Sequence, residues 1–433
     1  MVDATVPRRR FAAVVRNLAA SNAAIYLFAL VTAPLQAHAL GPEGRGLLAA
    51  VLVPTAVAPW IADMGRASYA THASARGVAP GRLIGSLGAL AVATGILGMV
   101  AAPALASLFA DGRDVVYQYL LIGLLLLPVL LFGQVLTGIN TGLERWGAVI
   151  ASRFISAGGL LVAVVVLFAF GRLTVATTAL SVFACSLLSL LPQWLPLRRE
   201  RPRFSPRAAI AGARFGARAW VASLASLSNI SLDQLLMAVL VSERQLGLYA
   251  VAFTLSNVSA AFTGAVVTSV APRVARGDQV LAQVSVRLTL AFVTGIGAVV
   301  AAAAPIGLPL LFGSAFADAV PLAWILLAAA VPLAGAQVLG SALIADGAPG
   351  LPAITESLAL VVTFTALWIT LPRYGALAAA VVSVCAYSLN FALLVVLARR
   401  RIGGRAVDFV LARPAELRQA AARVREMVTP SAG

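Results

Sequence analysis

The chain has no lysine and little charge of either sign. Only 11% of its 433 residues are charged, and all 32 of its basic residues are arginines. Soluble proteins carry about 25% charged residues, so this sequence cannot cover a water-facing surface over its whole length. Without lysine there is neither a P-loop lysine nor a Schiff-base lysine, which excludes a P-loop ATPase.

Cysteine and histidine are also scarce, with two of each in the chain. Cys185 and Cys385 both lie in apolar stretches, where thiols are typical of packing residues. His38 and His72 lie too far apart in the sequence to indicate a metal site. We therefore expect no metal and no cofactor, apart from a coupling ion considered below.

What the chain has in abundance is apolar length, because 61% of its residues are hydrophobic. A helix needs about 20 apolar residues to cross a bilayer core roughly 30 Å thick. The sequence therefore predicts an all-α polytopic membrane protein with about 12 transmembrane helices. The expected spans are 17–39, 47–64, 83–104, 117–138, 149–170, 176–196, 216–241, 247–270, 287–311, 321–345, 354–371 and 375–398.

The arginines are distributed unevenly about these spans. If the N-terminus is cytoplasmic, 27 of the 32 arginines lie in inner segments and only five lie outside. This excess follows the positive-inside rule, so both termini are expected in the cytoplasm. The net charge of +16 is then explained by anionic lipids at the cytoplasmic face, and no nucleic-acid partner is needed.

The two halves of the chain resemble each other at a spacing of about 200 residues. Residues 40–51, LGPEGRGLLAAV, align with residues 241–252, VSERQLGLYAVA, at a shift of 201. Two six-span halves of the same orientation are typical of transporters built from parallel repeats, whose cavity lies between the halves. The predicted parts are an N-terminal six-helix lobe at 1–197, a cytoplasmic Arg-rich linker at 198–215, a C-terminal six-helix lobe at 216–398 and a cytoplasmic basic tail at 399–433.

Two stretches indicate a family: ALGPEGRGLLA after the first span, and SLDQLLMAVLVSERQLGLYAVAFTLSNV across the seventh and eighth. With its repeat and its Arg-rich linker, the chain resembles the polysaccharide transporter family, which includes the Wzx-type O-antigen flippases of the multidrug/oligosaccharidyl-lipid/polysaccharide exporter superfamily. The resemblance implies a V-shaped bundle whose central cavity is lined mainly by spans 1, 2, 7 and 8.

The resemblance also implies a function. It implies a flippase, not an enzyme, that works by alternating access in the bacterial inner membrane. The expected substrate is an undecaprenyl-diphosphate-linked oligosaccharide, moved from the inner to the outer leaflet for polysaccharide or lipopolysaccharide biosynthesis. Expected partners are this lipid-linked glycan, membrane lipids, and a polysaccharide polymerase or glycosyltransferases.

A diphosphate can cross hydrocarbon only when it is paired or hydrated, because an isolated charge there costs on the order of 10 kcal/mol or more. Arginine suits this task because its planar fork binds phosphate at two points. Each arginine at the cytoplasmic end of the cavity could bind substrate or could instead anchor its span at the interface. The candidates are Arg16, Arg66, Arg218 and Arg273.

Asp233 lies well inside the seventh span, with Asn229 one helical turn before it. Residues four apart share a helix face, so we predict a polar face that points to the cavity and binds substrate. Acids inside membranes are rare and typical of functional sites. Asp233 would couple transport to an H⁺ or Na⁺ gradient or accept a sugar hydroxyl; the alternative is a buried acid satisfied by a neighbouring helix.

The motif LGPEGRG is predicted to form the outer turn between spans 1 and 2, and SERQLG occupies the same place in the second half. Gly41 and Pro42 would break the helix there. Each turn keeps one acid and one arginine, which could close an outer gate by salt bridges; a pair of solvated turns is the favoured explanation. The residues are Glu43, Arg45, Glu243 and Arg244.

Other functions stay open at this point. An ion-coupled multidrug antiporter of the same superfamily would favour an acidic, aromatic-lined pocket, whereas an arginine-rich rim favours an anionic substrate. A peptidoglycan-precursor flippase would have a closely similar sequence pattern. A membrane polymerase or ligase of glycan assembly would need a sizeable outward loop with catalytic groups, and the predicted outward loops are short.

Overall fold

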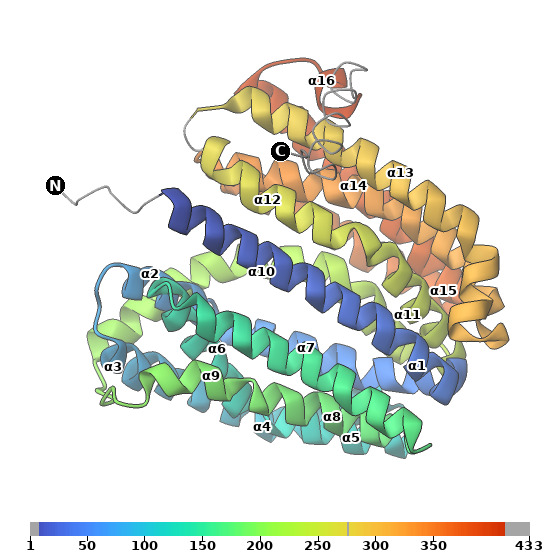
Figure 1. Ribbon diagram of the computed structural model, residues 1–433, viewed down its shortest axis with the longest axis horizontal. Helices are drawn as coiled ribbons and strands as arrows, with labels where there is room; N and C mark the ends of the chain where they lie inside the picture. The colour runs from blue at the N-terminus through green and yellow to red at the C-terminus, as the bar shows by residue number, and fades with distance from the viewer. Residues whose placement is uncertain (1–7, 275–276, 412–433) are drawn as a thin grey trace, which may run out of the picture.

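The computed structural model describes residues 8–274 and 277–411, and within them all side chains except those of 8–20, 22–23, 217–219, 221–230 and 271–272. Every regular element in this part of the chain is a helix, which confirms the all-α class. The long helices run side by side along the long axis of the molecule (Figure 1).

The helices of the first half, long and short, are α1 (Arg8–Asp63), α2 (Arg66–Ala75), α3 (Pro80–Leu83), η1 (Ile84–Gly88), α4 (Ala89–Ala110), α5 (Asp114–Leu125), α6 (Leu127–Gly142), α7 (Trp146–Ala169), α8 (Val175–Leu188), α9 (Leu190–Trp194) and η2 (Leu195–Leu197). In the second half they are α10 (Pro206–Leu240), α11 (Glu243–Ser256), η3 (Asn257–Ser259), α12 (Ala260–Val274), α13 (Gln279–Phe312), η4 (Ser314–Ala319), α14 (Val320–Ala345), α15 (Gly350–Ile402) and α16 (Val407–Val410).

Two of the long helices are each two spans joined at a glycine. Gly41 in α1 has φ +65° and Gly375 in α15 has φ +55°, a left-handed conformation that glycine adopts without strain. The chain turns back at Gly41 (Figure 1). The two ends of α15 also lie together, because Arg401 bonds Asp346 just before the start of that helix. The predicted turns between spans 1 and 2 and between spans 11 and 12 therefore exist.

Eight of the described helices are long and apolar enough to span a membrane, and the bent pair α5 and α6 would make a ninth. Divided at their glycines, α1 and α15 supply two predicted spans each. The remaining predicted span falls in α10, where many side chains lie outside the described part. The count of twelve therefore stays a prediction at α10, while the other spans occur in the predicted order.

The turns predicted to face outward meet at one end of the molecule. Arg113, between α4 and α5, reaches Glu243 at the start of α11. Gln245 in turn lies against Gly375, the turn within α15. These contacts join segments that are 130 residues apart in the sequence. The turns predicted to face outward therefore lie together, and successive turns alternate between the two ends of the bundle, as the predicted order of spans requires.

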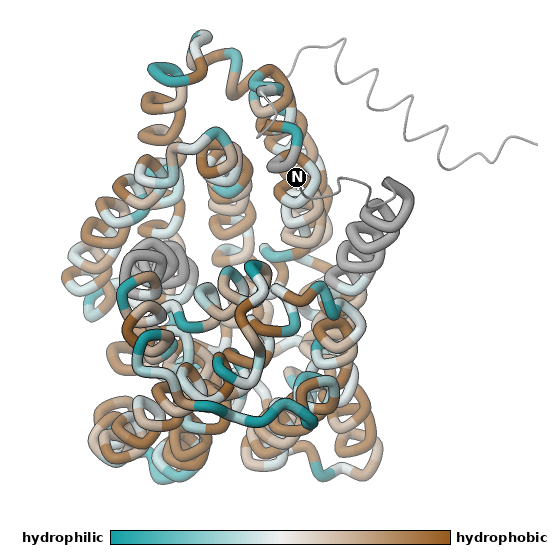
Figure 2. Tube along the Cα trace, turned by 90° about the vertical axis from the view of Figure 1, so that its left-hand side faces the viewer, coloured by the Kyte–Doolittle hydropathy of each residue, from teal (hydrophilic) through white to brown (hydrophobic). Residues whose placement is uncertain are grey.

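The Arg-rich linker is held against the N-terminal lobe at the other end. The backbone N–H of Arg203 donates to the carbonyl of Gly81 at 2.9 Å, and that of Ser205 donates to the hydroxyl of Ser86 at 2.9 Å. A Cβ at Gly85 would lie 2.5 Å from the carbonyl oxygen of Arg203, so a side chain there would block the approach. Figure 2 looks onto this end and shows hydrophilic residues on the segments that connect mainly apolar helices.

Helix α10 connects the two lobes. Trp220, in its first half, donates its indole N–H to the carbonyl of Ile61 at 2.9 Å, and Gly216 packs on the backbone of Gly65. Met237, in its last turns, is buried in the core of the C-terminal lobe. The predicted boundary between linker and second lobe therefore falls inside one continuous helix.

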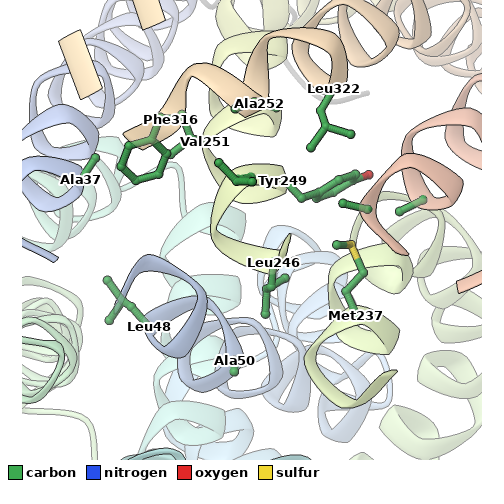
Figure 3. Packing of buried hydrophobic residues seen from close by; sticks show 14 of the residues in the cluster. Ala37, Leu48, Ala50, Met237, Leu246, Tyr249, Val251, Ala252, Phe316 and Leu322 are labelled. Carbon is green, nitrogen blue, oxygen red and sulfur yellow. The ribbon is translucent and has the colours of Figure 1, made fainter. Parts of the chain in front are cut away.

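The largest hydrophobic cluster of the described residues joins the two lobes near the end that is predicted to face outward (Figure 3). It forms where the second part of α1 packs along α11. Spans 1, 2, 7 and 8, which the resemblance implies to line a cavity, are in contact here, so the bundle is packed shut at this level. The labelled members are Ala37, Leu48, Ala50, Met237, Leu246, Tyr249, Val251, Ala252, Phe316 and Leu322.

Candidate functional site: the outer closure and a buried acid

The two lobes meet backbone to backbone at two glycines. A Cβ at Gly46 would lie 1.8 Å from the carbonyl oxygen of Glu243, and a Cβ at Gly247 would lie 1.8 Å from the carbonyl oxygen of Pro42. Both pairs are related by the shift of 201 residues that aligns the two halves of the sequence. The contact is therefore the same surface used twice, as in a two-fold interface. It closes the end that is predicted to face outward, and we call it the outer closure.

Arg113 fastens this closed end from the side. Its guanidinium belongs to the N-terminal lobe, contacts the carboxylate of Glu243 at 3.4 Å and donates to the carbonyl of Ala238 at 2.7 Å, both in the C-terminal lobe. The side chain is only 16% exposed, and it also bonds the carbonyls of Phe109 and Ala110 in its own lobe. Charge-assisted hydrogen bonds of this kind are stronger than neutral ones, so Arg113 stabilises the closed arrangement.

The four predicted gate residues do not pair with one another in the described part of the structure. Glu243 pairs across the lobes with Arg113, not with a residue of the LGPEGRG turn. Arg244 instead pairs with Asp318 of its own lobe at 2.7 Å. Neighbouring residues at a helix start point in different directions, so Glu243 reaches the N-terminal lobe while Arg244 reaches a residue of its own lobe.

The first-half turn makes no ion pair between lobes in the part of the chain described. Arg45 is directed back along its own helix and donates to the side-chain amide of Gln36. Glu43 is exposed. Of the four predicted residues, Glu243 is thus the one whose side chain is seen to link the two lobes, and a gating role for all four stays a prediction.

Replacing Arg113 with glutamine should loosen the outer closure. The variant loses the contact with Glu243 and the charge-assisted bond to the carbonyl of Ala238, and a hydrogen bond of a charged group contributes about 1.5–3 kcal/mol. In a chain whose two cysteines are changed to serine, a new cysteine at Ala50, buried at 0% exposure, reports opening. Arg113→Gln should raise its labelling by an impermeant thiol reagent severalfold.

The matched control for this variant is Arg244→Gln. It also removes one arginine from an ion pair at the outer end, but its partner Asp318 belongs to the same lobe. Labelling at position 50 should therefore stay at the level of the parent. Equal labelling in the Arg113 and Arg244 variants would contradict a special role for the cross-lobe contact.

Asp233 is buried inside the C-terminal lobe, with 2% of its surface exposed. Its carboxylate accepts hydrogen bonds from the hydroxyl of Tyr249 on α11, from Ser383 on α15 at 3.4 Å, and from the backbone N–H of Gln234 at 2.7 Å. The prediction that the side chain of Asp233 faces the cavity is therefore wrong, because α11 and α15 cover this side chain. The acid is satisfied by neighbouring helices, which leaves an oxygen-lined site where three helices meet.

Arg66 is also buried, at 4% exposure, in the N-terminal lobe. It donates to the carbonyls of Ala62 and Leu90 and, at 2.7 Å, to the hydroxyl of Thr94. A guanidinium whose donors are taken up by backbone carbonyls is typical of a residue that ties helices together. Its predicted contact with substrate stays a prediction that this arrangement does not favour.

Arg273 has the opposite environment, at the end of α12. Its side chain is 63% exposed and lies 3.7 Å from the carboxylate of Asp278. It also lines a cavity between α12 and α13. The other predicted substrate residues, Arg16, Arg218 and Asn229, have side chains outside the described part of the structure.

Sequence reasoning missed Arg113, Tyr249 and Ser383. Arg113 was counted only as an outer-loop arginine, although it stands one residue after the glycine of an ADGRD turn. Tyr249 and Ser383 lie in apolar spans, and a serine hydroxyl there usually bonds the backbone of its own helix, as Ser383 also does. A signal was available for Tyr249, since it falls two residues after Gly247 of the repeat.

Solved transporter structures share this fold at low sequence identity. The structure titled as the inward-facing conformation of a multidrug resistance MATE family transporter of the MOP superfamily has a TM-score of 0.71 and 14% identity, over 89% of this chain and 98% of that one. The lipid II flippase MurJ in an inward closed conformation has a TM-score of 0.70 and 13% identity, over 94% of this chain and 99% of that one. The MATE multidrug transporter DinF-BH has a TM-score of 0.64 and 14% identity, over 94% of this chain and 98% of that one.

Comparison of the sequence with known proteins and families identifies one family. No curated protein matches this sequence. Residues 15–277 match the polysaccharide biosynthesis protein family, a region that covers the first lobe, the linker and α10 to α12, and so contains both glycines of the outer closure. The chain belongs to the polysaccharide biosynthesis protein family, and it is a multi-pass membrane protein with the two-lobed fold of the MOP-superfamily transporters.

Proposed function

We propose that this protein is a flippase that moves an undecaprenyl-diphosphate-linked oligosaccharide from the inner to the outer leaflet by alternating access. The observation that supports this most is the outer closure by Gly46 and Gly247. Alternating access needs an end that seals and then separates, with the lobes moving as units. Besides the apolar packing of α1 along α11, the polar links between the lobes at this end that must break on opening, among the described residues, are the ion pair and the hydrogen bond of Arg113.

The substrate class follows from charge and family. The members of the family are described as polysaccharide biosynthesis proteins. A glycan assembled on the cytoplasmic side would be attached to a polyprenyl diphosphate, which holds it in the membrane. The distribution of arginines supports an inner-membrane orientation with both termini in the cytoplasm, so the substrate would enter from the arginine-rich side. A polymerase or glycosyltransferase acting on the same glycan is the partner class that fits this direction.

Energy for transport would enter at Asp233. A buried carboxylate is costly to keep charged unless it is paired or neutralised. A proton, or a Na⁺ ion bound by the carboxylate and the hydroxyls of Tyr249 and Ser383, would neutralise it. We propose that H⁺ or Na⁺ occupies this site in one state of the cycle and leaves in the other.

Transport into liposomes tests the proposal. The full chain is reconstituted with a fluorescent polyprenyl-diphosphate oligosaccharide, and an impermeant quencher or glycosidase measures how much of it reaches the opposite leaflet. We expect protein-dependent translocation of this lipid and none of a cationic dye. Translocation of the dye alone would support a multidrug antiporter, and equal rates for lipid II would point to the peptidoglycan precursor.

A further inference from the structure

Helices α12 and α13 enclose a cavity of about 320 Å³ close to the turn that joins them. Its volume lies at the lower end of the range of about 300–1,000 Å³ found for ligand pockets. The walls are mainly apolar, and the one charged side chain among them is an arginine. The lining residues are Phe262, Val266, Ser269, Val270 and Arg273 of α12, and Leu281, Ser285, Leu288 and Thr289 of α13.

The lining of the cavity extends along both helices. On α12 it runs from Phe262 to Arg273, eleven residues that rise about 16 Å at about 1.5 Å per residue. On α13 it runs from Leu281 to Thr289, so the cavity is a groove between the two helices.

The two ends of the cavity differ in chemistry. Phe262 at one end stacks on Phe292 with ring centroids 3.8 Å apart, which makes that end aromatic and apolar. Arg273 at the other end is 63% exposed and lies 3.7 Å from Asp278, beyond hydrogen-bond distance. Asp278 itself caps α13 by accepting the backbone N–H of Leu281 at 3.2 Å. Arg273 therefore keeps donors for another anion.

We propose that this groove holds the part of the substrate's single prenyl chain nearest the headgroup, while Arg273 binds the adjoining phosphate. A phospholipid is the alternative occupant, and competition between the two lipids distinguishes them. Helix α12 also contacts α1 of the other lobe, so a chain held here would lie against a helix that takes part in the interface between the lobes. The inference rests on the proposed flippase function and names a tail site for the same substrate.

Binding of a polyprenyl phosphate, and of the matching neutral polyprenol, to the purified full chain tests the groove by native mass spectrometry. Val266→Trp fills the groove and should weaken both ligands about tenfold. Arg273→Gln should weaken the phosphate about tenfold, since a charge-assisted hydrogen bond is lost, and leave the polyprenol unchanged. The matched controls are Val299→Trp, at a position 69% exposed on the same helix α13, and Arg400→Gln, an exposed arginine elsewhere.

A third variant tests whether the occupant is hydrocarbon. The hydroxyl of Thr289 is buried in the wall without a hydrogen-bond partner in the described part of the chain. Thr289→Val should therefore keep or strengthen polyprenol binding, and a loss would indicate a polar ligand and overturn the proposal. So would equal weakening by Val266→Trp and Val299→Trp, or competition by phosphatidylglycerol as effective as that by the polyprenyl phosphate.

The groove and the flippase function fail in different ways. If the wild-type protein does not translocate the lipid-linked glycan, the proposed function is wrong whatever the groove binds. If the wild type translocates it and the Val266→Trp and Arg273→Gln variants bind and translocate as the wild type does, the groove alone is wrong.

Discussion

Gly46→Ala should lower the rate of lipid-linked glycan translocation by tenfold or more. The added methyl would meet the carbonyl oxygen of Glu243 at 1.8 Å, and that oxygen belongs to the backbone at the start of α11, which cannot rotate away. Overpacking of this kind costs about 1–3 kcal/mol, and about 1.4 kcal/mol is a factor of ten in an equilibrium. The cost falls only on states in which the outer end is closed, so the lobes are held apart there.

Two measurements separate this effect from misfolding. The variant should remain in the membrane at normal amount, and a cysteine at Ala50 should become more reactive from outside by about tenfold. Gly295→Ala is the matched control, because a Cβ at this glycine of α13 would meet nothing within 4 Å. Unchanged labelling at position 50 together with unchanged translocation would show that the backbone contact does not govern closure.

The repeat explains why this position could be found from sequence. A shift of 201 residues aligned Gly46 with Gly247, and the structure places these two glycines at one symmetric contact. Apolar length predicted most spans, because each must cross a bilayer core of fixed thickness. The alignment did not explain why glycine stands at these two positions. The explanation is the close approach of two helix backbones that lie far apart in the chain, which an alignment does not show.

Side-chain partners were predicted less well, for a related physical reason. Arg66 was placed at a cavity from its position at the end of a span, yet its hydrogen-bond acceptors include Leu90 and Thr94 of α4. Arg113 was passed over, although its partner Glu243 was named as a gate residue. Periodicity fixes which residues share a face of one helix, whereas these contacts depend on how separate helices and turns come together.

Asp233→Asn should slow transport driven by an ion gradient at least about tenfold while leaving the fold intact. The amide has nearly the same size as the carboxylate, so packing around a residue 2% exposed is preserved. Its oxygen can still accept the hydrogen bond from Tyr249, whereas its NH2 group cannot accept the one from the backbone N–H of Gln234. The change removes the charge that a proton or Na⁺ would neutralise. Translocation under an imposed H⁺ or Na⁺ gradient should fall by at least about tenfold, as for loss of a transition-state interaction of roughly 1.4 kcal/mol.

Asp318→Asn is the matched control for the loss of one carboxylate, because Asp318 is 67% exposed at the outer end, where it pairs with Arg244. It should translocate at the rate of the parent under the same gradient. Bound polyprenyl phosphate should be unchanged in both variants, because Asp233 is covered by α11 and α15 rather than by substrate. If Asp233→Asn still responds to the gradient as the parent does, the buried acid only ties α10 to its neighbours, and the energy for transport enters elsewhere.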